Sequence, residues 1–367
     1  MSLPQEKKFL HALALAGAEY DALQKIYSAL GSYEAAWQAD TAALASAGIS
    51  RELIERLARI RTELNPDDAM RSLVAEGIAL VMADEPEFPA ELREIASPPL
   101  ALYMKGKVGL DLPRLAVVGT RKATAYGREA TQKIIRDIAS QTEIAIVSGL
   151  ATGIDTEAHR AALAHGLITV GVLGSGMDHT SFFPPENWNL AEDIISNGGA
   201  VISEYPPGAP ALKHHFPARN RIIAGLAKGA LVIEAPERSG ALITARFAME
   251  QGRDVFAVPG QLFSQSAIGA HRLIQDGAKL VMKAEDIIAE LGLPRRARAD
   301  AAAFGGGGDL TDDTSRTILS LLGEPKSVDE LKEETDLATP DIIARLSLLE
   351  LNGLIRSLGQ NRFGRTT

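Results

Sequence analysis

Between residues 111 and 292, short apolar segments rich in β-branched residues alternate with amphipathic helical stretches such as Tyr126–Gln141 and Gly240–Gln251. Strands that are apolar on both faces belong to parallel sheets covered by helices on both sides. The pattern therefore predicts a doubly wound, Rossmann-like α/β domain with a parallel sheet over residues 111–292. The segments expected as strands are Leu115–Val118, Ile144–Val147, Ile168–Leu173, Ala200–Ser203, Ala230–Ile233 and Asp254–Val258.

Two further parts precede this domain. Residues 1–64 carry apolar positions at helical spacing, interrupted by glycines, and predict a small helical domain with Ser50 as one N-cap. Its segment Leu44–Ile49 suits the turn of a SAM-like or helix-hairpin-helix domain, although a simple turn between two helices is the favoured interpretation. Residues 65–110 are expected to form a connector with strands at Ile78–Met82 and Leu100–Met104.

Two more parts follow it. Residues 293–309 have the Ala- and Gly-rich composition of a flexible linker. Residues 310–367 predict three helices and then a hairpin at Leu354–Phe363, the order of a winged helix, with Ser327 and Thr339 as N-caps. Asp309–Thr367 holds 7 Lys and Arg against 11 Asp and Glu. Helices that read bases are usually more basic, so we expect this part to bind a protein partner or to contact DNA weakly.

Composition limits the function. The chain has no cysteine, which excludes disulfides, cysteine-ligated zinc and a thiol nucleophile. The N-terminus lacks a signal-peptide pattern and no stretch approaches the ~20 apolar residues of a membrane helix. We therefore expect a cytoplasmic protein without membrane contact. Because the formal net charge is −9, any nucleic-acid site must be a local basic patch.

The loop after the fourth strand of the expected sheet carries such a patch. Between Ala211 and Lys228 there are four basic residues and no acidic one, and Phe216 lies between Lys213 and Arg219. Cations bind phosphates, and an aromatic ring stacks on an unpaired base. If this segment is extended, side chains three residues apart would lie ~10 Å apart and meet successive nucleotides. The sequence thus predicts a single-strand site where the carboxyl ends of the strands meet.

Other loops at that edge add candidates for backbone and hydroxyl contacts with DNA, namely Gly119, Thr120, Lys122, Ser148 and Gly149. None completes G-x-G-x-x-G or a Walker A sequence, so no cofactor is expected. His179, His214 and His215 lack an ordered ligand spacing, and no metal site is expected. Asp155 is expected to be an N-cap and His159 a structural partner. No catalytic pair stands out, and Glu234 and Glu250 are the first candidates for a hydrolase.

The central domain carries an ordered set of short motifs, which are Val118–Arg121, Ser148–Asp155, Val172–Gly176, Phe216–Gly225, Glu234-Ala, Ser239–Ala245 and Val258–Gly260. Taken in this order, they resemble the DprA (Smf) family of bacterial DNA-processing proteins. The resemblance covers about residues 78–292, and the head and tail match longer family members. Thr120 stands where the family motif often has serine, which keeps the hydroxyl.

The resemblance implies a protein without enzymatic activity that binds and protects single-stranded DNA and helps load the RecA recombinase. It further implies a role in natural transformation and recombination, and a homodimer. Carried over to this sequence, the DNA-binding residues are Arg121, Lys213, Phe216, Arg219, Asn220 and Arg221.

The alternative is a nucleotide-binding or nucleotide-hydrolysing enzyme of the same superfamily. Its P-G-G-x-G-T loop is absent, since Ala235–Gly240 reads A-P-E-R-S-G. A sequence-specific repressor is a third possibility, which the acidic balance of the tail disfavours.

Overall fold

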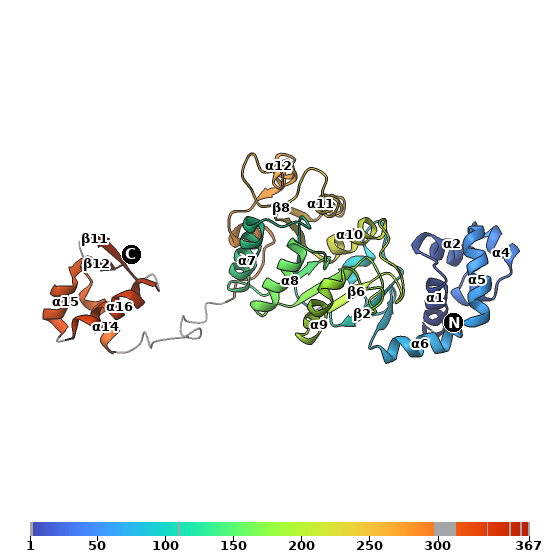
Figure 1. Cartoon of the computed structure of the whole chain (residues 1–367), viewed down its shortest axis with the longest axis horizontal. Coiled ribbons are helices and arrows are strands. Elements are labelled where there is room, and N and C mark those ends of the chain that lie inside the picture. The colour runs from blue at the N-terminus through green and yellow to red at the C-terminus, as the bar shows by residue number, and fades with distance from the viewer. Residues whose placement is uncertain are drawn as a thin grey trace. The chain divides into compact units, whose positions relative to one another are not determined.

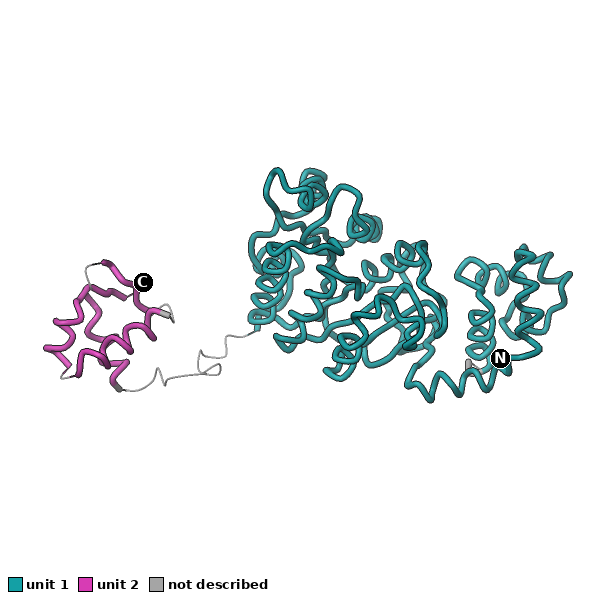
Figure 2. The backbone as a smooth tube through the Cα atoms, in the orientation of Figure 1, with its two compact units in different colours: residues 1–296 teal, residues 297–367 magenta. Residues whose placement is uncertain are grey.

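The computed structural model describes residues 3–108, 111–296, 313–335, 337–351, 354–359 and 362–365. The chain forms two compact units, residues 1–296 and residues 297–367 (Figure 2). The expected linker is residues 293–309, and its part from residue 297 onward lies outside the described residues. The finer domain boundaries at residues 64 and 110 stay predictions.

The first unit begins with a helical head whose core includes Leu13, Ile26 and Leu57. As expected, Ser50 caps a helix, because its Oγ accepts a hydrogen bond from the Leu53 amide. Gly48, at φ 76°, makes the turn before it. The head helices are α1 (Leu3–Leu15), α2 (Tyr20–Leu30), α3 (Tyr33–Gln38), α4 (Thr41–Ser46) and α5 (Arg51–Glu63), and α6 (Pro66–Ala75) leads on to the sheet.

A nine-stranded sheet with the order β1-β2-β6-β5-β4-β3-β7-β8-β9 forms the centre of the unit (Figure 1). Each strand expected from the sequence is present, which confirms the α/β fold. The short strand β9 was not expected. The strands are β1 (Ala79–Met82), β2 (Ala101–Gly106), β3 (Arg114–Val118), β4 (Ala145–Ser148), β5 (Thr169–Leu173), β6 (Ala200–Ser203), β7 (Gly229–Val232), β8 (Asp254–Ala257) and β9 (Lys279–Leu280).

The sheet is parallel from β6 to β9 but not throughout. Strand β2 runs antiparallel to β6, and β1 runs antiparallel to β2. These two strands come from the stretch that the sequence set apart as a connector. The parallel sheet expected over residues 111–292 is confirmed. The pairing of the two connector strands at its edge was not predicted, because local patterns do not show which distant strand a segment pairs with.

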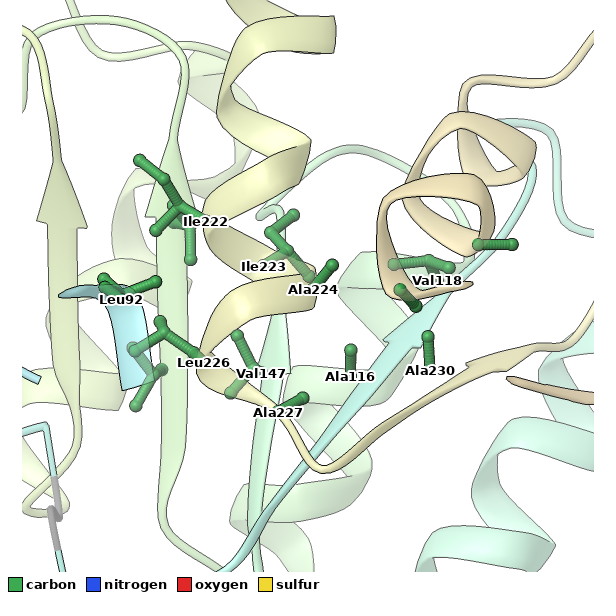
Figure 3. Packing of buried hydrophobic residues seen from close by; sticks show 14 of the residues in the cluster. Leu92, Ala116, Val118, Val147, Ile222, Ile223, Ala224, Leu226, Ala227 and Ala230 are labelled. Carbon is green, nitrogen blue, oxygen red and sulfur yellow. The ribbon is translucent and has the colours of Figure 1, made fainter. Parts of the chain in front are cut away.

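Helices cover both faces of the sheet. On one face, α7 (Ala125–Ala139), α8 (Ile154–Ala164) and α13 (Ala284–Glu290) share a core with the strands. On the other, Ile223 of α10 (His215–Leu226) and Ala227, just past the end of that helix, pack over Ala116, Val147 and Ala230 (Figure 3). The remaining elements are η1 (Ala90–Arg93), η2 (Pro185–Asn187), α9 (Trp188–Ser196), α10 (His215–Leu226), α11 (Gly240–Glu250) and α12 (Ile268–Gln275).

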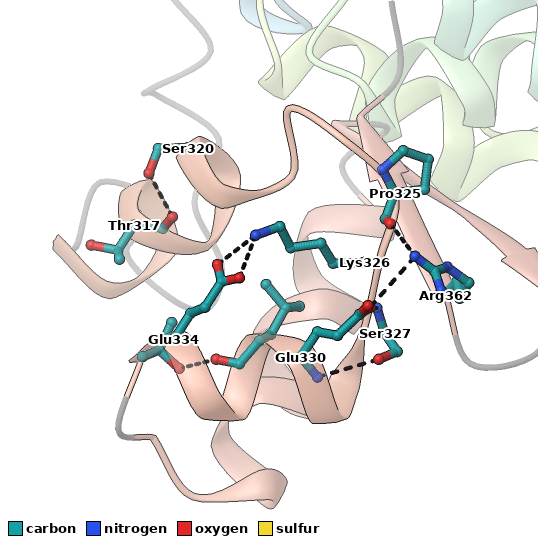
Figure 4. Close-up of polar contacts among 10 residues, drawn as sticks. Thr317, Ser320, Pro325, Lys326, Ser327, Glu330, Glu334 and Arg362 are labelled. Carbon is teal, nitrogen blue, oxygen red and sulfur yellow. Dashed lines mark hydrogen bonds and ion pairs between the residues drawn. The ribbon is translucent and has the colours of Figure 1, made fainter.

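The second unit has the three helices and the hairpin expected from the sequence. Ser327 caps its helix as predicted, since the Ser327 amide donates to Glu330 and the Glu330 amide donates to Ser327 Oγ (Figure 4). The elements are α14 (Asp313–Leu321), β10 (Lys326–Ser327), α15 (Val328–Thr335), α16 (Thr339–Leu351), β11 (Ile355–Gly359) and β12 (Arg362–Arg365), with the sheet order β10-β12-β11.

Two cations of this unit already have partners inside it. Lys326 pairs with Glu334 at 2.5 Å, and Arg362 lies 3.5 Å from Glu330 (Figure 4). Among the described residues of either unit, no helix is long and apolar enough to cross a membrane.

Candidate nucleic-acid interface

Strands β3 and β7 are neighbours in the sheet although their connections leave in opposite directions. Ligands of doubly wound sheets bind at such a switch point, beyond the carboxyl ends of the strands. A cleft of about 480 Å³ lies there. The loops after β3, β4 and β7 and the first turn of α10 line it, so the expected convergence of these loops is confirmed.

Arg121 and Phe216 form the centre of the interface. The guanidinium carbon of Arg121 lies 5.0 Å from the ring centre of Phe216. Arg121 is exposed and Phe216 is half-buried. Both residues also line a second hollow of about 150 Å³, together with Phe183, whose ring centre is 5.7 Å from that of Phe216. The pair thus borders two adjoining hollows.

The loop after β3 holds Arg121 in place through close backbone approaches. A Cβ on Gly119 would come 2.5 Å from the Ile154 side chain, and one on Gly153 would come 2.3 Å from the Thr120 carbonyl oxygen. Gly153 also has φ 82°, a conformation that favours glycine. In addition, the Thr120 amide donates to the Glu234 carbonyl at 2.7 Å. The tight fit explains why this rim is rich in glycine.

The expectation of an extended segment around Phe216 is wrong. Residues from His215 onward form helix α10, because Ile223 and Leu226 pack its inner side against the sheet core. Phe216 and Asn220 are therefore one helical turn apart, with neighbouring side chains on one face. The helix gathers these residues at one end of the cleft and does not spread them along a strand of DNA.

Arg219 is buried beneath the cleft and braces its wall. Its guanidinium donates to the carbonyl oxygens of Gly149, at 2.7 Å, and of Val172. Burial lowers the pKa of Arg219 to about 10, and nearby Asp155 partly offsets this effect, so Arg219 remains charged at neutral pH. The side chain ties the loop after β4 to α10.

Asp155 is not the N-cap of α8, because that position belongs to Gly153. Its carboxylate instead accepts the Gly149 amide at 3.1 Å. Burial raises the pKa of Asp155 to about 6 even though Arg219 favours its charged form. His159 is structural, as expected, with Nδ1 2.7 Å from Thr169 Oγ1.

Arg221 lies away from the cleft. Its guanidinium is 2.6 Å from a Glu204 carboxylate oxygen and 5.4 Å from the ring centre of Tyr20. Only 7% of the residue is exposed. Direct contact between Arg221 and DNA remains an untested prediction, and the geometry does not favour it. Asn220 does line the cleft, where its Nδ2 donates to the Gly240 carbonyl at 3.2 Å.

The other predicted residues take different places. Lys213 is exposed and lines the cleft. Gly119 and the buried Thr120 also line the cleft. Lys122 is exposed beside it. Ser148 is buried and donates to the Val117 carbonyl at 2.6 Å, which gives it a structural role. Gly149 lines the second hollow.

Sequence reasoning missed Arg238 and Phe183. Arg238 is exposed in the loop after β7 and lines the cleft, and its charge in an edge loop was the signal that could have found it. Phe183 lies farther along the loop that follows β5 and, as an uncharged residue, gave no such signal. Within the described residues, Arg121, Lys213 and Arg238 have no carboxylate partner, and Asp155 is the single acid among those lining the cleft.

The two carboxylates suspected for hydrolysis are placed elsewhere. Glu234 accepts hydrogen bonds from the amide and hydroxyl of Thr124 and from Ser266. Glu250 is exposed at the end of α11 and pairs with Arg246 at 2.7 Å. Neither side chain lines the cleft among the described residues, so neither is placed to act on a nucleotide bound there.

Residues 79–292 match the family described as DNA recombination-mediator protein A, and residues 294–361 match the DprA winged helix domain. The chain is 50% identical over 204 residues to the DNA processing protein DprA of Streptococcus pneumoniae, covering 55% of this chain and 71% of that protein. It is 34% identical over 358 residues to protein Smf of Synechocystis, covering 88% and 89%.

Two DprA proteins are among the solved structures that resemble this fold. DprA from Streptococcus pneumoniae superposes with a TM-score of 0.63 at 38% identity, over 77% of this chain and 97% of that chain. DprA from Helicobacter pylori, described for its single-stranded DNA binding mode, has a TM-score of 0.51 at 27% identity over 58% of this chain and 95% of that chain.

Proposed function

The chain belongs to the DprA (Smf) family of DNA-processing proteins, and from that premise we propose that it binds single-stranded DNA at the carboxyl edge of β3 and β7. The observation that carries the proposal is the Arg121–Phe216 pair between two hollows. An unpaired base can stack on the exposed part of the Phe216 ring while Arg121 holds the adjoining phosphate.

Charge at the cleft supports a polyanionic ligand. Arg121, Lys213 and Arg238 are exposed cations without carboxylate partners among the described residues, in a chain whose net charge is −9. Each can neutralise one phosphate and release counterions. In an intact duplex the base faces are stacked on one another, so a site built around a half-buried ring selects unpaired strands.

Whether each side chain is exposed or buried determines the role that we propose for it. Arg121, Lys213, Phe216 and Arg238 contact DNA directly, and Asn220 lies within reach at the cleft wall. Arg219 and Arg221 hold the first turns of α10 in place through Gly149 and Glu204.

Finer roles rest on family membership. We propose that the protein protects single strands, helps load RecA onto them in recombination and natural transformation, acts in the cytoplasm as a homodimer, and catalyses no reaction. The paired cations of the winged helix support a protein partner for that unit over duplex reading.

The test is fluorescence anisotropy of a labelled oligothymidine across a salt series, with unlabelled duplex as competitor. Salt-sensitive binding that duplex competes poorly supports the proposal. If the protein does not bind at low salt, or releases a base from a panel of nucleoside monophosphates, the nucleotide-hydrolase alternative takes its place.

A further inference from the structure

Three metal-ligating side chains meet outside the DNA cleft. Glu19 precedes α2 in the helical head, whereas His214 and His215 begin α10. One ligand atom from each residue lies within 4.8 Å of the other two. The cluster joins segments almost two hundred positions apart, and the sequence predicted no metal site at its histidines.

Glu19 and the two histidines are either partners in hydrogen bonds or ligands of one metal ion, and the distances between their atoms bear on the choice. His214 Nε2 lies 3.4 Å from Glu19 Oε2, and His215 Nε2 lies 3.3 Å from Glu19 Oε1. A charge-assisted hydrogen bond between imidazolium and carboxylate would be shorter, at about 2.7–2.9 Å. Ligand atoms at about 2.0–2.1 Å from a tetrahedral Zn²⁺ ion are about 3.3–3.4 Å apart. Each contact is close in length to an edge of a zinc tetrahedron, but the two reach different oxygens of Glu19, so a small rotation of the carboxylate is needed to bring one oxygen near both imidazoles.

The ligand set is also that of zinc. Two imidazoles and one carboxylate are the three protein ligands of many zinc sites that leave a fourth position open. Glu19, His214 and His215 all line a cavity of about 870 Å³ between the head and the main domain, which leaves room for a water molecule as a fourth ligand. His214 and Glu19 are 64% and 49% exposed, so an ion can reach them.

We propose that Glu19, His214 and His215 bind one Zn²⁺ ion, or a transition-metal ion of similar preference, and thereby link the helical head to the start of α10. Magnesium is excluded as the main occupant, because it prefers oxygen ligands in octahedral geometry.

The surroundings set the affinity. The His215 ring stacks on Tyr205 with ring centres 3.8 Å apart, which orients its Nε2. Its Nδ1 is buried without a hydrogen-bond partner among the described residues. With the ion on Nε2, this Nδ1 carries the proton, so we expect weaker binding than at zinc sites whose histidines are supported on both nitrogens.

The experiment is calorimetric titration of Zn²⁺ into the full-length, tag-free, chelator-treated protein. The expected result is one ion per chain and a higher Tm with Zn²⁺ but not with Mg²⁺. Glu19→Gln and His214→Ala change exposed side chains and should each lose the binding and the Tm shift. His165→Ala, which removes an exposed histidine outside the cluster, should keep both.

Absence of stoichiometric binding would overturn the proposal, as would equal Zn²⁺ affinity in wild type, Glu19→Gln and His214→Ala. Zn²⁺ binding in a Phe216→Ala variant should equal that of the wild type, so this result does not depend on whether the protein binds DNA.

Discussion

Arg121 stands over the face of Phe216, 5.0 Å from the ring centre, although 95 positions separate them in the chain. Arg121 lies in the loop that follows β3, and Phe216 is the second residue of α10. A cation and a ring held together in this way can bind a phosphate and the base of an adjoining nucleotide.

Phe216→Ala should weaken binding of oligothymidine by about 1–3 kcal/mol for each base that stacks on the ring. Phe216→Trp should keep most of the affinity, because a larger ring offers the same kind of face. Phe263→Ala is the matched control, since Phe263 is 92% exposed and does not line the cleft. Anisotropy titrations measure all three, and equal losses for Phe216→Ala and Phe263→Ala would contradict the site.

A plot of log affinity against log salt concentration has a negative slope. Arg121→Gln and Arg238→Gln should each make this slope less steep by about 0.7, the value for one phosphate contact on a single strand. Arg221→Gln should leave the slope unchanged, because Glu204 already neutralises Arg221. The measurement is the affinity at four or more salt concentrations. A less steep slope for Arg221→Gln would indicate that Arg221 contacts a phosphate after all.

Gly149→Ala should destabilise the fold by about 1–3 kcal/mol through overpacking. The added Cβ would lie 2.6 Å from Arg219 Nη2 and 2.7 Å from Asp155 Oδ2. Gly240→Ala meets nothing within 4 Å and serves as control. Urea unfolding gives both values, and a neutral Gly149→Ala would show that the buried pair yields easily.

His11→Gln should remove part of the acid sensitivity of folding. Burial lowers the pKa of His11 from 6.5 to about 4, so the unfolded chain takes up a proton that the folded chain resists. The stability that this group contributes is complete above pH 6.5 and is lost as pH falls through 4, by up to about 1.4 kcal/mol per unit. The difference between wild type and variant in free energy of unfolding should therefore shrink across that window. A constant difference would contradict it.

A chain ending at Arg296 should bind oligothymidine within about twofold of the full-length protein, because the residues proposed to contact DNA lie in the first unit. The measurement is a side-by-side anisotropy titration. A large loss of affinity would place a DNA contact in the winged-helix unit.

Much of the fold was predictable because it depends on local chemistry. Apolar runs such as Leu115–Val118 predicted strands, and Ser50 and Ser327 predicted helix starts, since a buried strand and a cap each have a short-range signature. The loops at the carboxyl ends of the parallel strands followed from topology, and with them Arg121, Lys213 and Phe216 at one cleft.

Only the tertiary structure showed which side chains are buried and which distant segments pair. By sequence, Arg219 and Arg221 look like Lys213, yet Gly149 and Glu204 hold them beneath the surface, and the segment around Phe216 is a helix because the sheet buries its inner side. Phe183 at the second hollow, and Glu19 beside His214 and His215, likewise come together only through distant packing. The sequence by itself determined which basic and aromatic side chains were available, and long-range contacts decided which of them face the cleft.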